Sequence, residues 1–383
     1  MKISRYISFL ILLLASIDIA SAQQNLGQRR GVTSPEVHDD GSVTIRLFAP
    51  KAQEVLLKGD FVADGCVAMC RCEDGVWEYH SAPLASELYC YRLAVDGMGD
   101  ICDPASSYVM RDVSTLMSYF IIGGGRGDDY RAQEVAHGSV NRVWAKMSDG
   151  CERRMTIYTP ADYEESDAHY PVLYLLHGMG GDEEAWLATG RAAEIMDNLI
   201  AAGRAEKMIV VMTNGCTRHV SAPGYSHEGM WAPYMSGSMD GSFEGLFPEI
   251  VTWIDKHYRT VASASHRAIA GLSMGGFHAM YISMSYPADF DYVGLFSAAI
   301  YRGEEGVDIY EAMNESLARQ FAQGPQLYWI GIGKYDFLYE ENLQYRAQLD
   351  SCGYRYIYHE STGGHEWRNW RCYLVEFAER LFK

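Results

Sequence analysis

The chain has 383 residues, of which 48% are hydrophobic and 21% are charged, and this is enough apolar material for more than one packed domain. Its formal net charge is −18, with 50 acidic against 32 basic side chains. The charge argues against nucleic acid as a partner, because that affinity depends on Lys and Arg that neutralise phosphates, and it disfavours anionic membranes. A neutral or weakly charged substrate is compatible with it.

Residues 1–22 have the pattern of an export signal. Lys2 and Arg5 make a basic start, and an apolar run too short to span a bilayer comfortably precedes the small-residue cleavage site Ala-Ser-Ala at 20–22. We expect an exported protein, periplasmic or extracellular, with a membrane anchor as the alternative. Cleavage removes two basic residues and one acidic residue, which takes the net charge from −18 to −19. No later segment is long and apolar enough to span a membrane.

Residues 31–122 are predicted to form a small all-β sandwich. Four stretches have the pattern of strands and are separated by Gly, Asp and Pro, which mark turns: GSVTIRLFAP, AQEVLLKGDF, GVWEYHSAP and LYCYRLAVDG. Residues 123–137 follow as a linker, which begins with the loop-forming stretch GGGRGDDY.

Residues 138–383 change to strands that alternate with helices. Six apolar runs predict strands: YPVLYLLHG, KMIVVMTNG, HRAIAGLS, YVGLFSAA, QLYWIGIG and YRYIYHES. Stretches between and after them predict helices over 182–203, 242–258, 274–286, 337–353 and 366–383. This order predicts an α/β-hydrolase type of fold, a mostly parallel sheet covered by helices on both faces, in which ligands gather at the carboxyl ends of strands.

The third of these strands ends in Ser273, in the sequence GLSMGG. A strand, a Gly-x-Ser-x-Gly turn and a helix form the context of a nucleophile elbow, in which the flanking residues must be small for the backbone to turn so sharply. An ordinary Gly/Ser turn is the alternative. We predict that Ser273 is a catalytic nucleophile, which requires a base within hydrogen-bond reach and an acid that orients the base.

The base of such a site belongs in a loop at the carboxyl end of a strand, after the acid in the chain. His365 lies in a glycine loop between the last strand and the last helix and is the predicted base. The other downstream histidines are less suitable, because His278 lies in the helix after the serine and His359 lies in a strand.

The acid should follow an earlier strand. Asp336 lies just past the strand QLYWIGIG and is the predicted acid. Its rivals are Glu340 and Glu341, which are predicted to lie on the following helix, and Asp350, which lies near the end of that helix.

Two backbone amides are predicted to form an oxyanion hole. One is the amide of Met274, which follows the serine, and the other is that of Met179 in LLHGMGG, the loop after an earlier strand. The same stretch also fits a tight strand-to-helix turn, and the two interpretations are compatible.

Aromatic side chains close to these loops could wall a substrate cleft. Trp231, Tyr225 and Tyr234 lie in the loop PGYSHEGMWAPYM, and Trp186 lies near the start of a predicted helix. We predict that these side chains bind substrate, with core packing as the alternative.

No metal or organic cofactor is expected. Cys66, Cys70 and Cys72 lie close together, but neither a His nor a second Cys-x-x-Cys pair of zinc-finger spacing accompanies them. Buried thiols, or one or two disulfides in an exported protein, are expected instead.

Four motifs, LLHGMGG, GLSMGG, GKYDFLY and GGHEW, occur in an order and spacing that resembles the esterase D-like branch of the α/β-hydrolases. Within it, residues 138–383 resemble carbohydrate esterase family one, the feruloyl and acetylxylan esterases. Residues 31–122 resemble the early-set β-sandwich of carbohydrate-binding module family forty-eight. The resemblance implies hydrolysis of hydroxycinnamoyl or acetyl esters on xylan or its oligosaccharides, as in exported esterases of plant-wall-degrading bacteria.

Together these features predict an exported serine esterase that hydrolyses feruloyl esters on plant cell-wall xylan. The alternatives are an acetylxylan esterase, an enterobactin-type siderophore esterase, and a serine peptidase or acyltransferase with the same triad. A carbohydrate-binding protein with an inactive hydrolase domain is the alternative of another class. Because every predicted catalytic residue lies beyond Ala136, a chain that begins there is expected to keep activity on small esters.

Overall fold

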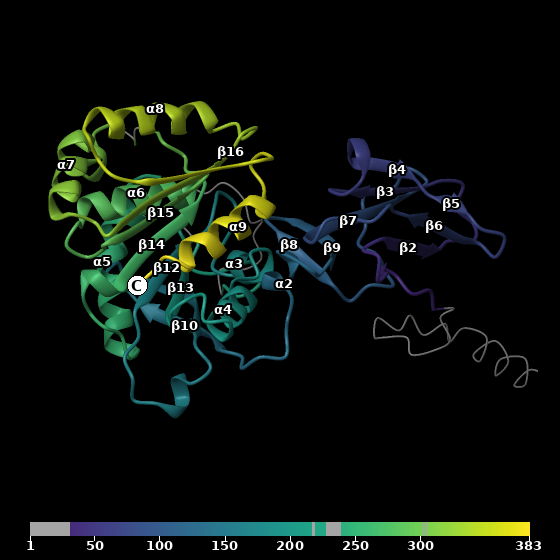
Figure 1. Ribbon diagram of the computed structural model, residues 1–383, viewed down its shortest axis with the longest axis horizontal. Helices are drawn as coiled ribbons and strands as arrows, with labels where there is room; N and C mark the ends of the chain where they lie inside the picture. Colours follow the sequence, from purple (N-terminus) through teal and green to yellow (C-terminus); the bar gives the residue numbers. More distant parts are fainter. Residues whose placement is uncertain (1–30, 217–218, 227–238, 302, 304) are drawn as a thin grey trace, which may run out of the picture.

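A computed structural model describes residues 31–216, 219–226, 239–301, 303 and 305–383 (Figure 1). Strands of residues 36–121 form two antiparallel sheets, and strands of residues 139–361 form one larger sheet with helices on both faces. The predicted fold class, a mostly parallel α/β sheet preceded by an all-β sandwich, is confirmed. Among the described residues, no helix combines the length and the apolar character that a membrane span needs.

The N-terminal region is a sandwich of two sheets, with strand orders β1-β2-β6-β5 and β4-β3-β7-β9-β8. Inward-facing side chains of both sheets close a hydrophobic core of their own, which includes Ile45, Leu57, Trp77 and Phe120. The strands are β1 Glu36–Val37, β2 Val43–Phe48, β3 Val55–Gly59, β4 Cys66–Ala68, β5 Cys70–Arg71, β6 Val76–His80, β7 Leu88–Val95, β8 Val109–Asp112 and β9 Thr115–Ile121.

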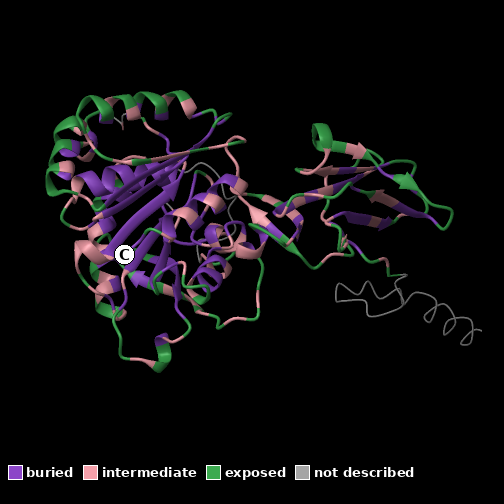
Figure 2. Cartoon of the chain, in the orientation of Figure 1, coloured by how far each residue is buried: buried purple, intermediate pink, exposed green. Residues whose placement is uncertain are grey.

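The C-terminal region is built on an eight-stranded sheet of order β10-β11-β13-β12-β14-β15-β16-β17. Neighbouring strands are parallel from β13 to β17, and the antiparallel hairpin β10–β11 extends the sheet at its other edge. Its central strands are buried along their whole length, which explains their continuous apolar sequences (Figure 2). The strands are β10 Ser139–Lys146, β11 Glu152–Thr159, β12 Val172–Leu176, β13 Ile209–Thr213, β14 Arg267–Leu272, β15 Tyr292–Phe296, β16 Leu327–Gly333 and β17 Ile357–Ser361.

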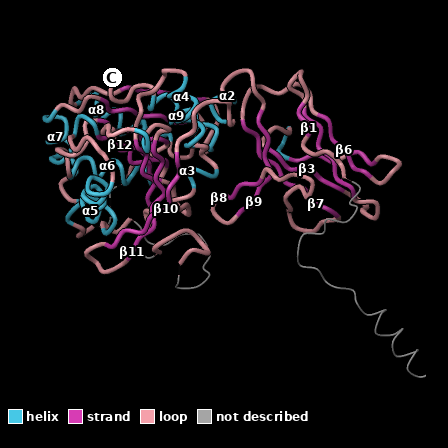
Figure 3. Tube along the Cα trace, turned by 90° about the horizontal axis from the view of Figure 1, so that it is seen from below, coloured by secondary structure: helices cyan, strands magenta, loops and turns pink. Residues whose placement is uncertain are grey.

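Helices cover this sheet on both faces, and Figure 3 shows them around the strands from below. One hydrophobic cluster joins α5, α6, α7 and α8 to one face, and a second cluster joins α3, α4 and α9 to the other. The helices are α2 Gly127–Tyr130, α3 Ala185–Ala188, α4 Ala192–Ala201, α5 Ser242–His257, α6 Met274–Ser285, α7 Met313–Gln323, α8 Tyr339–Ser351 and α9 Trp367–Ala378, with single 3-10 turns at 63–65, 163–165, 264–266 and 308–310.

Several elements differ from those predicted. The helix expected over 182–203 is divided into α3 and α4, because Arg191 adopts a left-handed backbone conformation with φ 56°. Part of the expected linker forms α2, and its Tyr130 is buried in the cluster that contains α4 and α9. The hairpin β10–β11 and helix α7 were not predicted, since their many charged and polar side chains hide the apolar pattern.

The two regions meet at a buried junction. Leu88 of β7 and Met110 of β8 belong to the hydrophobic cluster on the α9 side of the larger sheet. The buried guanidinium of Arg371 on α9 donates to Glu87 Oε1 and to the carbonyl of Leu88, each at 3.3 Å. The sandwich is therefore attached by apolar contacts and paired buried charges as well as by the linker.

A second charged contact ties the sandwich to the loop after β12. The guanidinium of Arg111, on β8, lies 2.5 Å from a carboxylate oxygen of Asp182, whose side chain is fully buried. Figure 1 shows β8 and β9 at the side of the larger sheet where α3 lies. This contact brings the β8–β9 hairpin to the carboxyl ends of the parallel strands.

Candidate active site

Ser273 lies at the sharp turn between β14 and α6. Its backbone angles, φ 54° and ψ −116°, are costly for a residue other than glycine and persist only where the surroundings fix them. Three backbone hydrogen bonds fix them here, one of them from the amide of Phe277 to the carbonyl of Ser273 at 3.1 Å. The amide of Ser273 donates to the carbonyl of Phe296 at 2.9 Å, and the amide of Ala299 donates to the carbonyl of Ser273 at 3.0 Å. The serine is thereby held at the carboxyl end of the parallel sheet.

Two glycines let α6 approach the sheet closely enough for this turn. A Cβ on Gly275 would lie 2.4 Å from the carbonyl oxygen of Leu176, and a Cβ on Gly276 would lie 2.5 Å from the Cβ of Ala298. Backbone and a short side chain cannot move aside for a methyl group. The glycines after the serine are therefore required for packing, and this packing sets the position of the turn.

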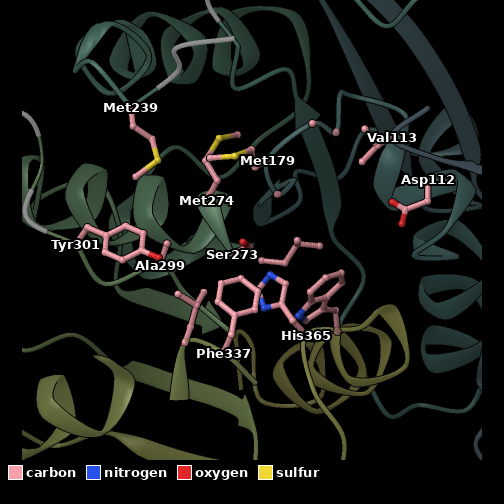
Figure 4. Close-up of a pocket in the computed structure, with 16 residues that line it drawn as sticks. Asp112, Val113, Met179, Met239, Ser273, Met274, Ala299, Tyr301, Phe337 and His365 are labelled. Carbon is pink, nitrogen blue, oxygen red and sulfur yellow. The ribbon is translucent and has the colours of Figure 1, made fainter. Parts of the chain in front are cut away.

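Asp336 and His365 form a hydrogen-bonded pair, and Figure 4 shows His365 beside Ser273. His365 Nδ1 lies 2.9 Å from Oδ2 and 3.0 Å from Oδ1 of Asp336, whose side chain is fully buried. The amide of Leu338 also donates to this carboxylate at 2.9 Å. A carboxylate only accepts, so Nδ1 of His365 carries a proton and Nε2 is left to accept one.

The other candidate bases are engaged elsewhere. His278 is fully buried, and its Nδ1 lies 2.7 Å from Oε1 of Glu244. His359 lies on β17, where its Nδ1 is 2.9 Å from Oε2 of Glu376. Neither ring lines the cavity that contains the serine. The structure therefore brings one of the three downstream histidines to Ser273.

The rival acids lie on α8, as predicted from the sequence. Glu340 and Glu341 are in its first turn, and Asp350 accepts a hydrogen bond from the hydroxyl of Tyr356 at 2.9 Å. Within the described residues, no hydrogen bond or ion pair joins any of these three carboxylates to His365. Of the four candidate acids, Asp336 is the one that the fold places against the imidazole.

Ser273 and His365 line a cavity of about 570 Å³ at the carboxyl ends of the strands. Its walls are largely apolar and include Met239, Leu272, Ala299, Tyr301, Phe337 and Leu338. The ring of Phe337 lies against the imidazole of His365, with centroids 4.5 Å apart, and Trp370 meets that imidazole edge-on at 4.9 Å. The cavity suits an apolar group next to the serine hydroxyl.

The loop after β12 brings backbone amides to the same cavity. Met179 and Met274, the two predicted oxyanion donors, both line it. A Cβ on Gly178 would lie 2.4 Å from Cδ1 of Leu272, so this glycine lets the loop close against the serine turn. The amide of Met179 donates no hydrogen bond to any described residue, which leaves it available to a ligand.

His177 fixes the shape of this loop, a role that the sequence alone did not indicate. Its Nε2 accepts from the amide of Gly215 at 2.8 Å, so its Nδ1 carries the proton and donates to the carbonyl of Gly178 at 2.8 Å. Burial lowers the pKa of His177, which keeps the ring in this neutral form. His177 thus fixes the loop through two buried hydrogen bonds, and Gly178 lets its backbone contact Leu272.

Buried charges lie behind the loop. Glu183 accepts hydrogen bonds from Arg154 at 2.8 Å, from Asn214 at 3.1 Å and from the amide of Ala222 at 2.7 Å. Burial, reinforced by the neighbouring Asp182 carboxylate, raises the pKa of Glu183 to about 7 in spite of these bonds. The polar groups behind the loop are thereby paired. Burial of the ionised Glu183 carboxylate still costs free energy, and this cost grows as the pH rises and the group loses its proton.

The sandwich also contributes to the cavity. Asp112 and Val113, at the turn between β8 and β9, line it. Oδ1 of Asp112 accepts from the indole N–H of Trp367 at 3.1 Å, two residues after His365. A second cavity of about 520 Å³ lies between the two regions and shares Asp112 and His365 with the first. This argues against the expectation that a chain from Ala136 keeps a complete site, because the missing part supplies a wall and a contact to residues 362–367, here called the histidine loop, which contain His365 and the first residue of α9.

The aromatic residues predicted to bind substrate do not line the cavity in the described part of the chain. The prediction for Trp186 is wrong, because the ring is buried and its indole N–H donates to a carbonyl of β12 at 2.9 Å. Tyr225 is exposed, and the guanidinium carbon of Arg154 lies 4.0 Å from the centroid of its ring. Trp231 and Tyr234 lie outside the described residues.

Tyr301 and Phe337 line the cavity instead, and neither was predicted. Both follow the carboxyl end of a parallel strand, β15 and β16 respectively, and that position could have identified them. Trp370 comes from the buried side of α9 and Met239 from the segment before α5. No pattern in the sequence distinguishes these two from core residues.

The cysteines near the N-terminus do not form the disulfides or buried thiols that were expected, since Cys66, Cys70 and Cys72 are unpaired and exposed. Within the described ranges, the one group of three side chains that could hold a metal ion is on β17 and α9, and none of its members lines the catalytic cavity. The arrangement around Ser273 thus brings together the predicted nucleophile, base and acid and the two predicted backbone donors.

A family model described as "Putative esterase" matches residues 146–381. Among curated proteins, an endo-1,4-beta-xylanase/feruloyl esterase of Xylanibacter ruminicola is 29% identical over 369 residues, which cover 92% of this chain and 46% of that protein. An esterase of Mycobacterium tuberculosis is 30% identical over 212 residues, which cover 54% of this chain and 41% of that protein. The chain spans less than half the length of each of these two relatives.

Solved structures share the fold. A ferulic acid esterase is 26% identical, with a TM-score of 0.51, over 63% of this chain and 97% of that chain. A ferulic acid esterase of Anaeromyces mucronatus is 24% identical, with a TM-score of 0.54, over 67% of this chain and 95% of that chain. The enterobactin esterase of Shigella flexneri is 16% identical, with a TM-score of 0.61, over 88% of this chain and 92% of that chain.

The pKa of Glu183 makes a testable prediction about stability. It rises from an ordinary value of 4.5 to about 7 in the folded protein, so the folded state binds the extra proton and stability falls as the pH rises through this range. In Glu183→Gln, we expect the loss of unfolding free energy between about pH 5 and pH 7 to shrink by about 2 kcal/mol. Chemical denaturation of both proteins at the two pH values measures this difference.

Glu184→Gln is the matched control for this experiment. The pKa of Glu184 is lowered: burial raises it, but the guanidinium groups of Arg142 and Arg154 more than compensate. Because Glu184 is ionised in both the folded and the unfolded protein above its ordinary pKa of 4.5, its contribution to stability is nearly constant between about pH 5 and pH 7. Equal pH dependence in Glu183→Gln and the wild type would contradict the prediction.

Proposed function

The chain belongs to the esterase family whose model matches residues 146–381, and from this membership we propose that it is an exported serine esterase acting on feruloyl esters of plant cell-wall xylan. The observation that carries the proposal is the Asp336–His365 pair, which lies beside Ser273 in a cavity with aromatic walls. Such a triad hydrolyses esters with its own side chains and backbone amides. The export signal at residues 1–22 supports a substrate outside the cell.

In the proposed reaction, Oγ of Ser273 attacks the ester carbonyl and Nε2 of His365 takes the hydroxyl proton. The hydrogen bond from Nδ1 to Asp336 fixes the tautomer that this requires and stabilises the imidazolium that forms. The imidazolium returns the proton to the leaving alcohol, and the acyl group remains on the serine. The same histidine then deprotonates a water, which attacks the acyl carbonyl and releases the acid.

Each tetrahedral intermediate carries a negative oxygen, for which the amides of Met179 and Met274 are the proposed donors. Met274 is the first residue of α6, so the positive end of the helix dipole lies at the same place. A donor of this kind typically contributes about 3 kcal/mol of transition-state stabilisation. The anchoring of the loop by His177 supports the assignment, because a donor is effective only when it is held in place beforehand.

The walls of the cavity favour a flat acyl group. Tyr301 and Phe337 are large side chains, yet they are 42% and 70% exposed, so their rings offer surface to a ligand. Burial of an aromatic acyl ring against them contributes about 2 kcal/mol, a preference of roughly thirtyfold over an acetyl group. The relative from Xylanibacter ruminicola, an endo-1,4-beta-xylanase/feruloyl esterase, supports this substrate class. An acetyl ester of xylan is the second candidate.

The alcohol side of the ester is proposed to lie toward the sandwich. His365, which protonates the leaving alcohol, lines both the catalytic cavity and the cavity between the two regions. A sugar that carries the leaving oxygen would therefore extend along the sandwich. The resemblance of residues 31–122 to a carbohydrate-binding module supports the same orientation. The enterobactin esterase is a rival on fold alone, and the predicted export signal, which lies outside the described residues, favours a substrate outside the cell.

The triad is tested by three substitutions and one control. Ser273→Ala and His365→Ala should abolish nearly all turnover of a chromogenic acetate ester while the circular dichroism spectrum stays that of the wild type. Asp336→Asn should lower kcat about 10⁴-fold, because the amide holds the wrong tautomer of the histidine. Glu340→Gln should keep full activity. A folded Asp336→Asn protein with wild-type kcat would show that another group is the acid.

The contribution of the sandwich is tested at Asp112. Asp112→Ala should lower kcat/KM for a small ester about fivefold, since one hydrogen bond to the histidine loop is worth about 1 kcal/mol. Asp112→Asn keeps an oxygen acceptor for Trp367 and should restore most of the activity. Asp39→Ala removes an exposed carboxylate of the sandwich and is the control. A folded chain that begins at Ala136 and has full activity would contradict this role.

The acyl preference is tested by comparing methyl ferulate with an acetylated xylo-oligosaccharide. We expect kcat/KM to be higher for methyl ferulate, and Phe337→Ala to reduce the ratio of the two constants about tenfold or more. Tyr335→Ala, an equally exposed aromatic two residues away that does not line the cavity, should leave the ratio unchanged. A higher kcat/KM for the acetylated substrate that does not change in Phe337→Ala would contradict the feruloyl assignment and favour an acetylxylan esterase. Turnover of enterobactin, with neither of the other two esters hydrolysed, would favour a siderophore esterase.

A further inference from the structure

Three metal-ligating side chains meet between the last strand and the last helix. His359 lies on β17, and Cys372 and Glu376 lie on α9. One ligand atom from each lies within 4.8 Å of the other two, and in the part of the chain that the structure describes no second group of three such side chains is as close. None of them lines the catalytic cavity, and the proposed reaction does not use them.

The spacing of these side chains fits a metal ion. Cys372 and Glu376 are four residues apart on a helix and share one face, which His359 meets from the strand. Nδ1 of His359 is 2.9 Å from Oε2 of Glu376, and Sγ of Cys372 is 3.7 Å from Oε1. Ligand atoms bound about 2.0–2.3 Å from a tetrahedral zinc ion are themselves about 3.3–3.8 Å apart. Small side-chain adjustments would therefore bring the three atoms to one ion.

The imidazole is held in place for this role. The ring of Trp329 lies over it with centroids 6.1 Å apart and an interplanar angle of 28°, and the ring of Tyr373 meets it edge-on at 5.7 Å. The side chains of His359 and Glu376 are 29% and 25% exposed, which leaves a route for an ion and room for a water ligand. Three protein ligands and a water make the open four-coordinate arrangement that zinc adopts.

The ligand chemistry selects zinc or a similar transition metal. Thiolate and imidazole bind borderline-soft ions, whereas magnesium and calcium prefer oxygen ligands alone. Cysteine binds a metal as its thiolate, so binding of an ion releases the thiol proton of Cys372. The resulting thiolate and carboxylate together neutralise the two charges of the ion.

We propose that His359, Cys372 and Glu376 form a zinc site that joins β17 to α9. Residues 362–366, which include His365, connect these two elements. A bound ion would fix both ends of that loop without entering the cavity, so it would stabilise the fold and prolong activity on heating while basal turnover stays the same. The inference rests on the three side chains alone and does not depend on the substrate of the esterase.

Cobalt(II) is a direct probe of the site, because a cobalt–thiolate bond gives a charge-transfer band that oxygen and nitrogen ligands do not give. The reduced, tag-free full-length chain, first treated with EDTA, should bind one cobalt ion with this band, and equimolar zinc should remove it. Cys372→Ser should lose the band. Cys352→Ser, which changes an exposed cysteine at the end of α8, should keep it and is the matched control.

Thermal unfolding provides an independent measurement. Zinc should raise the Tm of the wild type and of Cys352→Ser, and it should not raise that of Cys372→Ser or His359→Gln relative to each variant in EDTA. Glu376→Gln, which keeps the size of the side chain, should weaken cobalt binding about tenfold or more. A wild-type chain without the thiolate band, or a band that persists in Cys372→Ser, would overturn the proposal.

Discussion

Helix α6 lies so close to the sheet that Gly275 has no room for a methyl group, whose carbon would be 2.4 Å from the carbonyl oxygen of Leu176. This contact forces the chain to turn abruptly after β14, and the strained backbone of Ser273 is the consequence. The cost of the strain is offset by the packing of a fully buried helix and by backbone hydrogen bonds on both sides of the serine. The same contact starts α6 next to the loop after β12, so the amide of Met274 and that loop share one cavity.

A network of buried polar groups makes the second half of the site rigid. The HGMGG loop is attached through the imidazole of His177, and Glu183 behind it binds Arg154 and two other donors. Buried polar groups must be paired, so every member of the network restricts the positions of its neighbours. Through Asp182 and Arg111 the network reaches the sandwich, which supplies Asp112 to the cavity and to the histidine loop. The site therefore belongs to both regions of the chain.

This arrangement explains how a shared fold can serve different esters. The turn at Ser273, the Asp336–His365 pair and the amides of Met179 and Met274 lie at the strand ends of the common sheet. The walls come from side chains that follow those strands, such as Tyr301 and Phe337, and from the β8–β9 hairpin of the sandwich. Substitution of the walls would change the shape of the cavity without changing the strand ends that hold Ser273, Asp336 and His365. That is why a structural likeness to an enterobactin esterase at 16% identity extends to the fold and no further.

The sequence by itself determined the class of the fold and the order of the proposed catalytic groups. Continuous apolar runs, glycines around Ser273 and the positions of Asp336 and His365 after strands are local patterns, and local patterns follow directly from backbone geometry. Prediction of helices and strands from the sequence failed where the apolar pattern was hidden or interrupted. Charged side chains concealed β10, β11 and α7, and the left-handed Arg191 divided one predicted helix into two.

Only the tertiary structure decided which side chains surround the serine. Trp186 and Trp370 are both buried tryptophans on helices of the same core cluster, yet only Trp370 also lines the cavity. Asp112 reaches the histidine loop from another region, and His359 meets Cys372 and Glu376 only because β17 and α9 are adjacent. These contacts join residues that are distant in the chain and follow no local period. They are set by how whole elements pack, which no short stretch of sequence encodes.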